Sequence, residues 1–199
     1  MLTVAFKNIL KKKFSVRSLL KWVIIAFVVG AFAGSASAVF LLLLEWAKET
    51  RDSHNWLLFF LPVGGVLVAA CYKFWGGNII KGNNLLIEEV QKPSKVISFL
   101  MAPLVLLGTI ITHVCGGSAG REGTAVQMGA AIADQLNFIK NFSNESRKIL
   151  IMCGMAAGFA SLFGTPLAGT LFAMEIIILG KVRYRGLLPI LLSALVANY

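Results

Sequence analysis

Charged residues are scarce in this sequence of 199 residues. They make up 14% of the chain, whereas about 25% is usual in a soluble globular domain. Acidic residues are rarest, with nine Asp and Glu in total, while hydrophobic residues reach 57% and the mean hydropathy is +0.79. This balance excludes an ordinary soluble domain, and it predicts an all-α protein that crosses a membrane several times.

Histidine and cysteine are also rare, which excludes several kinds of site. His54 and His113 lie far apart and neither has a second histidine at ligand spacing, so no metal site is predicted. Cys71, Cys115 and Cys153 are odd in number and embedded in apolar sequence, so we expect reduced packing residues. No nucleophile–base pair stands out, so neither an enzyme nor a cofactor is predicted. We expect His113 to be a hydrogen-bonded residue at a helix end.

Positive charge is in excess, with a formal net charge of +10. The basic residues flank apolar segments, which is typical of cytoplasmic loops and argues against nucleic acid as a partner. We therefore expect a cytoplasmic N-terminus, with an amphipathic helix over residues 2–14 on the membrane surface. The two basic clusters are Lys7, Lys11, Lys12, Lys13, Arg17 and Lys21, followed much later by Lys181, Arg183 and Arg185.

Long apolar runs predict the membrane spans. The segment Ala33–Ala38 imitates a signal-peptide cleavage site, but the apolar run continues beyond it, so residues 22–44 are predicted to form a retained first span. Residues 56–75 form a second span, interrupted at Pro62–Gly65, and residues 96–115 form a third. Shorter helices are predicted from Gly82 and over residues 122–136, 147–159, 166–179 and 187–197.

A glycine-rich segment, Gly116–Gly123, holds the adjacent pair Arg121 and Glu122. A charge at membrane depth costs about 2.5–3.5 kcal/mol on insertion scales, so such a pair indicates function. A glycine turn that opens a helix presents free N–H groups and the positive end of the helix dipole, both of which bind anions. Glu122 stands where an anion would bind, so we interpret it as a carboxylate gate. The Gly30/Gly34 and Gly154/Gly158 pairs, by contrast, predict close helix packing.

Three motifs together resemble those of the CLC anion channels and transporters. Gly120–Gly123 matches the loop of the gating glutamate in that family, and Gly164–Glu175 matches a later Pro-Leu-Ala-Gly…Leu-Phe…Glu segment. At Gly82–Leu86, chloride-type members carry Gly-Ser-Gly-Ile-Pro, so Asn83 replaces the serine that coordinates the anion. Thr124 stands where those members have proline. Both departures are similar to the bacterial fluoride/proton antiporters.

This resemblance implies the CLC inverted-repeat fold, with broken and re-entrant helices and only its first repeat present. Residues 18–199 would then form the first half of the CLC transmembrane domain, after the cytoplasmic segment 1–17. Glu122 would be the gating and proton-coupling residue. Ile176 stands where many chloride/proton antiporters carry an inner proton-transfer glutamate. The anion-binding residues would be Asn83, Gly82, Asn84, Gly120, Arg121, Gly123 and Thr124.

Other polar residues leave alternatives open. Arg121 either attracts anions at the outer mouth or anchors its loop. Glu88 and Glu89 are predicted to be surface charges on a helix near the cytoplasm, although one of them could reach a proton path. Glu175 is predicted to be a buried structural carboxylate. An amide at Asn83 offers two N–H donors where serine offers one O–H, which suits the strongly hydrated fluoride ion.

The expected function is fluoride/proton antiport across a bacterial cell membrane, in a homodimeric parent that has a second half. The first alternative is a chloride channel or a chloride/proton antiporter, and the second is a nontransporting half-CLC subunit. The ligands would be fluoride or chloride and protons, within the lipid bilayer. We expect the chain to be a fragment, a truncated reading frame, one part of a split protein, a half-length homodimer or a remnant.

Overall fold

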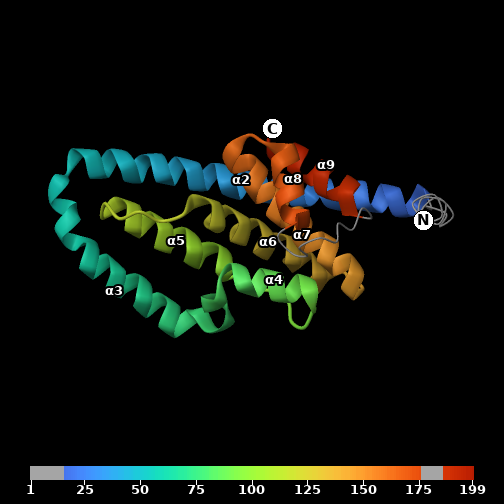
Figure 1. Cartoon of the computed structure of the whole chain (residues 1–199), viewed down its shortest axis with the longest axis horizontal. Coiled ribbons are helices and arrows are strands. Elements are labelled where there is room, and N and C mark those ends of the chain that lie inside the picture. The colour runs from blue at the N-terminus through green and yellow to red at the C-terminus, as the bar shows by residue number, and fades with distance from the viewer. Residues whose placement is uncertain (1–15, 176–185) are drawn as a thin grey trace.

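The computed structural model describes residues 16–175 and 186–199, which form helices and short connections with no β-strand among them (Figure 1). The longest helix, α2, covers Val16–Ser53 and runs along most of the molecule. It extends beyond the predicted residues 22–44 at both ends because no proline interrupts it. Its last turn carries Arg51, a favourable charge at a helix C-terminus.

Helix α9, Leu187–Ala197, packs closely against α2. A Cβ atom added to Gly30 would lie 2.6 Å from the Ser193 carbonyl oxygen, and one added to Gly34 would lie 2.9 Å from that of Ala197. The prediction that Gly30 and Gly34 form a packing surface is therefore confirmed.

The chain then forms a broken helix on the other side of the molecule: η1 (Asn55–Phe60), α3 (Leu61–Cys71), η2 (Tyr72–Gly76), η3 (Gly77–Lys81) and α4 (Asn83–Gln91). The predicted interruption at Pro62–Gly65 is wrong. Pro62 lies in the first turn of α3, where its missing N–H costs no helical hydrogen bond. The helix breaks at Gly77 (φ +46°), where the Gly76-Gly77-Asn78 sequence predicts a break, and at Gly82 (φ +56°), from which a short helix is predicted. Both backbone conformations favour glycine.

Helix α5 covers Met101–Val114 and starts later than the predicted residue 96. Before it, the Ile97 N–H donates to the Asp134 carboxylate at 2.7 Å, which holds this irregular segment against α6. Near the C-terminal end of α5, His113 Nδ1 lies 2.8 Å from the Thr109 carbonyl oxygen, which confirms the hydrogen-bonded helix-end prediction.

Helices α6 (Arg121–Ile139), α7 (Asn144–Phe163) and α8 (Pro166–Glu175) follow. The first two are longer than predicted. Ser143 caps α7 by accepting a hydrogen bond from the Ser146 N–H at 3.4 Å, and Gly164 ends it in a left-handed conformation. Glu175 is exposed, so its prediction as a buried carboxylate is wrong.

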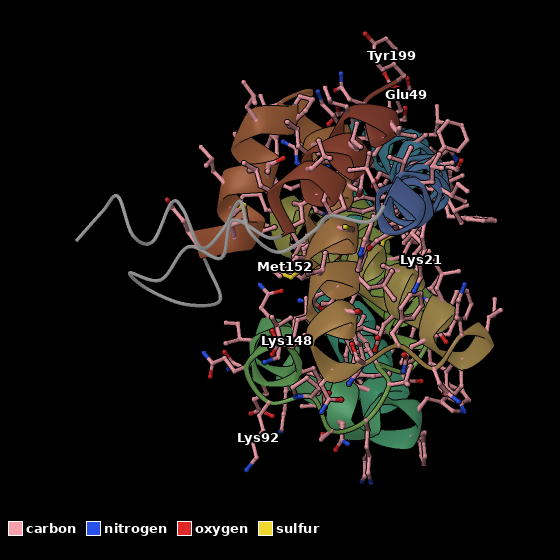
Figure 2. All side chains as sticks on the ribbon, turned by 90° about the vertical axis from the view of Figure 1, so that its right-hand side faces the viewer. Lys21, Glu49, Lys92, Lys148, Met152 and Tyr199 are labelled. Atoms are coloured by element: carbon pink, nitrogen blue, oxygen red, sulfur yellow. The ribbon has the colours of Figure 1, made fainter. Side chains whose placement is uncertain are left out.

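Helices α6 and α7 form the most extensive helix contact of the described chain. Their backbones approach so closely that a Cβ atom on Gly129 would overlap the Gly154 carbonyl oxygen, and one on Gly158 would overlap that of Ala125. The Gly154/Gly158 packing prediction is thus confirmed. Figure 2 views the bundle along its long axis, with Met152 of α7 among the helices and Lys92 pointing outward.

Three segments are long and apolar enough to cross a membrane: residues 18–53, 55–91 and 144–163. Helices α5 and α9 are apolar but shorter. The fold class is therefore confirmed as an all-α polytopic membrane protein. Three predicted features lie outside the described residues: the amphipathic helix over residues 2–14, the basic cluster of Lys181, Arg183 and Arg185, and Ile176.

Candidate anion site

Two helices begin beside one another at the candidate site. Helix α4 starts at Asn83 after Gly82, and α6 starts at Arg121 after Gly120. Neither helix start is capped by a side chain, in contrast to α7 with its Ser143 cap. The first N–H groups of a helix have no partner within it, so both helix starts offer donors and partial positive charge.

A side-chain hydrogen bond joins these two helix starts. Gln127 Nε2 of α6 donates to Asn83 Oδ1 of α4 at 2.9 Å, across 44 positions of sequence. A glycine borders each of the two amides. A Cβ atom on Gly123 would lie 3.5 Å from Asn83 Nδ2, and one on Gly82 would lie 3.4 Å from Gln127 Nε2. The structure thus brings the predicted residues Gly82, Asn83 and Gly123 together around one interhelical contact.

Arg121 and Glu122 are both exposed in the described chain. Among the described residues, no hydrogen bond or ion pair holds either side chain, so Arg121 does not anchor its loop through a salt bridge. Glu122 lies in the first turn of α6, where a carboxylate is favoured by the helix dipole. Asn84 is exposed in the first turn of α4.

Thr124 is buried, and its hydroxyl lies 2.7 Å from the Thr109 hydroxyl on α5. It also donates to the Gly120 carbonyl oxygen at 3.1 Å. These contacts fix the start of α6 against α5. The Thr124 side chain therefore braces the start of α6, and the backbone N–H groups of this first turn have no partner within the helix.

A cavity of about 280 Å³ lies beside the start of α6. Gly120, Gly123, Thr124 and Gln127 line one part of it, and Tyr72 of η2 lines another. Its lining combines hydroxyl, amide and backbone groups, and a water molecule occupies about 30 Å³ of liquid volume, so the cavity has room for several waters.

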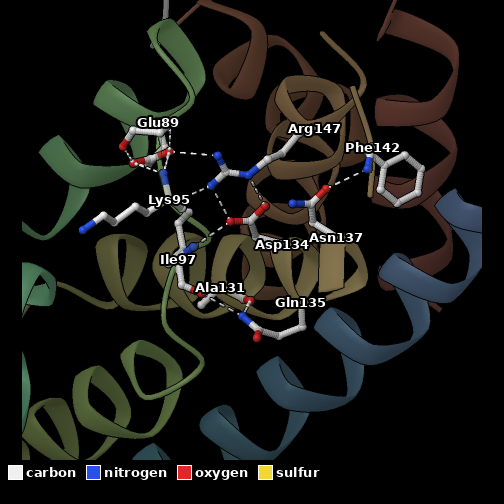
Figure 3. Close-up of polar contacts among 10 residues, drawn as sticks. Glu89, Lys95, Ile97, Ala131, Asp134, Gln135, Asn137, Phe142 and Arg147 are labelled. Carbon is white, nitrogen blue, oxygen red and sulfur yellow. Dashed lines mark hydrogen bonds and ion pairs between the residues drawn. The ribbon is translucent and has the colours of Figure 1, made fainter. Parts of the chain in front are cut away.

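A buried polar cluster lies elsewhere in the described chain, and the sequence did not predict it. Arg147 of α7 donates from Nε and Nη2 to the two oxygens of Asp134 on α6, at 2.8 and 2.7 Å (Figure 3). Its Nη1 donates to Glu89 on α4 at 2.9 Å, and its Nη2 also donates to the Lys95 carbonyl oxygen. Arg147, Asp134 and Glu89 are 4%, 0% and 5% exposed, so this ionic cluster is buried.

Glu89 is therefore not the surface charge that the sequence predicted. Its oxygens accept from the Ser94 hydroxyl at 2.6 Å and the Ser94 N–H at 2.9 Å, in addition to Arg147. Because every contact donates toward the carboxylate, the site favours the ionised form and does not suit a proton carrier. Glu88 is exposed as predicted, and it pairs with Lys81 at 2.6 Å.

Buried charges are paired, but the sequence signal for this cluster is weak. Asp134 is a buried acidic residue in the second half of α6. Arg147 lies among polar residues at the start of α7. An acidic residue within an apolar helix was the available clue. The tertiary contact with α4 was needed to identify all three members.

Residues 64–199 match the family model described as voltage gated chloride channel. The chain belongs to the CLC family. It is 47% identical over 178 residues to a chloride/fluoride channel protein of Pseudomonas syringae pv. tomato, covering 89% of this chain and 39% of that protein. It is also 30% identical over 198 residues to the voltage-gated ClC-type chloride channel ClcB of Escherichia coli, covering 87% of this chain and 45% of the relative.

The fold agrees with this assignment. The crystal structure of a CLC-type fluoride/proton antiporter superposes with a TM-score of 0.87 and 38% sequence identity, covering 94% of this chain and 47% of that one. The chain thus spans less than half the length of these relatives. The predicted family is confirmed. CLC proteins are membrane proteins that transport anions, and they are not an enzyme family.

Proposed function

We propose that this chain is the first half of a bacterial fluoride/proton antiporter. The observation that carries the proposal is the meeting of two uncapped helix starts at Asn83, with Glu122 in the first turn of one of them. The Pseudomonas relative, named a chloride/fluoride channel protein, and the fluoride/proton antiporter structure both support this proposal.

In this proposal the anion binds between the two helix starts. Asn83 contributes its side-chain N–H groups, and the backbone around Gly82, Asn84, Gly120 and Gly123 contributes further donors and positive dipole ends. Fluoride loses strong hydration on entering such a site, so it needs several strong donors to replace water. A primary amide supplies more N–H donors than the single O–H of a serine at the same position.

Glu122 acts as the gate and carries the coupled proton. Its carboxylate competes with the anion for the positive end of α6, and protonation removes both its charge and this competition. One side chain thereby links proton binding to anion movement. The exposed position of Glu122 in the described chain leaves it free to move between the site and the outside, and Arg121 beside it attracts anions.

A second half supplies the remaining anion donors and covers the glycine loops. Backbone groups at membrane depth need partners, because each unsatisfied group in hydrocarbon costs several kcal/mol. The complete transporter, meaning residues 1–199 together with this second half, is a homodimer in the cell membrane. Its N-terminus is cytoplasmic, as the basic residues before Trp22 indicate.

The test is ion selectivity in liposomes that contain the complete transporter. We predict that fluoride efflux exceeds chloride efflux by at least about tenfold, which corresponds to roughly 1.4 kcal/mol of discrimination. Asn83→Ser should lower this ratio. Ser98→Ala, which changes an exposed residue in the segment before α5 and outside the site, should preserve it. Equal efflux of the two anions would reject fluoride specificity and favour a chloride channel or chloride/proton antiporter. Absence of any anion flux would favour a nontransporting subunit.

A further inference from the structure

The amide of Asn83 has two chemically opposite ends, so its orientation decides what it offers to an anion. The oxygen end repels an anion and the NH₂ end binds one. The side chain is exposed on α4, and a freely rotating amide would present either end. A site that relies on Asn83 as a donor therefore needs a second group that fixes the orientation of this amide.

Gln127 supplies that group. Its Nε2 donates to Asn83 Oδ1 at 2.9 Å, so the oxygen end of the Asn83 amide faces Gln127. The Nδ2 end then lies at the opposite edge of the same planar group, beside Gly123 in the first turn of α6. Among the described residues no acceptor holds Asn83 Nδ2, which leaves both of its N–H groups available. Gly123 adds no side chain to block them, since a Cβ atom there would lie 3.5 Å from Nδ2.

We propose that Gln127 is a positioning residue for anion selectivity: it fixes the Asn83 amide with its N–H groups toward the anion. This inference rests on the proposed function, because it assumes that Asn83 binds the transported anion. Gln127 itself does not contact the anion in this proposal. It lies farther along α6 than Glu122 and acts only through Asn83.

A purely structural role for Gln127, as the bond that holds α4 in place, is less well supported. Helix α4 is already fixed near its C-terminal end, where Glu89 bonds to Arg147 at 2.9 Å and to Ser94 at 2.6 Å. Leu85 and Leu86, in the middle of α4, are also buried in the core. Loss of the Gln127 hydrogen bond should therefore free the Asn83 amide while α4 remains attached.

The experiment measures fluoride and chloride transport by the complete transporter in liposomes. Gln127→Leu removes the donor, and Gln127→Glu places a carboxylate that repels Asn83 Oδ1 and favours the reversed amide. We expect the fluoride concentration at half-maximal rate to rise at least about tenfold in both variants, with a larger increase for Gln127→Glu. The fluoride-to-chloride rate ratio should fall in parallel.

A matched control is Gln135→Leu on the same helix. Gln135 Nε2 donates to the carbonyl oxygens of Ile97 and Ala131, each at 2.8 Å, so its loss affects structure without touching Asn83. This variant should lower thermal stability but keep the half-saturating fluoride concentration within about twofold of the wild-type value.

A test in a second variant background distinguishes a positioning role of Gln127 from a purely structural one. In Asn83→Ser the residue no longer has an amide to orient, so adding Gln127→Leu should change half-saturation less than about twofold. The same tenfold loss in this background would overturn the inference, as would wild-type half-saturation in Gln127→Leu alone. If Asn83→Ala leaves fluoride transport unchanged, Asn83 is not a ligand, and the proposed site fails together with the inference.

Discussion

Removal of Asp134 tests how the buried ionic cluster holds α4, α6 and α7 together. We predict that Asp134→Ala lowers the free energy of unfolding of the complete transporter by about 4 kcal/mol. Asp134 is fully buried and accepts from Arg147 Nε and Nη2 and from the Ile97 N–H. The substitution leaves Arg147, which is 4% exposed, with Glu89 as its remaining acidic partner.

The magnitude follows from two overlapping contributions. Breaking a buried ion pair by removing one partner costs about 3–5 kcal/mol. A buried donor left without an acceptor, here the Ile97 N–H, costs about 1–3 kcal/mol. Part of this cost is already included in the value for the ion pair. Glu89→Gln should cost less, because the Ser94 hydroxyl and an amide oxygen can still pair and Arg147 keeps both bonds to Asp134.

The assay is denaturation in mixed detergent micelles, followed by tryptophan fluorescence. Lys148→Met is the matched control, since this partly buried neighbour of Arg147 pairs at 3.1 Å with Glu145, whose side chain is exposed. An ion pair with a solvated partner contributes about 0–1 kcal/mol. A double-mutant cycle between Asp134→Ala and Arg147→Ala should give a strong coupling energy. The reasoning is refuted if Asp134→Ala costs no more than Lys148→Met, or if the two substitutions are additive.

Two further predictions concern packing and assembly. Gly129→Ala should lower the free energy of unfolding by about 1–3 kcal/mol, because the added Cβ overpacks against Gly154. Gly65→Ala, whose added Cβ meets nothing within 4 Å, should be neutral or stabilising in the same unfolding assay. Equal effects of the two substitutions would reject the close contact of α6 and α7. Residues 1–199 alone in liposomes should give no selective anion flux, and co-expression with a second half should restore it; robust fluoride flux from the isolated chain would instead favour an assembly of identical halves.

The sequence predicted the helical membrane fold well because apolar runs and glycine pairs are patterns that can be recognised within a short segment. The spacing of Gly30 and Gly34 and of Gly154 and Gly158 indicated close helix packing, and the structure identifies the partners as α9 and α6. Boundaries were less accurate. Pro62 suggested that the second span is interrupted, yet a proline in the first turn of a helix is compatible with that helix. The capping geometry decides such cases, and the residue type alone does not.

The candidate site was predicted in part. Motif resemblance located Asn83 and Glu122, and the structure places the starts of their helices side by side. The proposed role of Gln127 and the cluster of Glu89 with Arg147 depend on contacts 44 and 58 positions apart in sequence. Such contacts follow from the way helices pack in three dimensions, and no local pattern reveals them.

The central claim is that Glu122 couples fluoride to protons, and proton uptake against its gradient tests it most directly. Liposomes containing the complete transporter and a fluoride gradient should accumulate or lose protons uphill, as reported by a pH-sensitive dye. Glu122→Gln cannot carry a proton, so we predict that it abolishes this uphill movement while fluoride still crosses the membrane. Proton movement that persists in Glu122→Gln at the wild-type rate would contradict the account and place the coupling residue elsewhere.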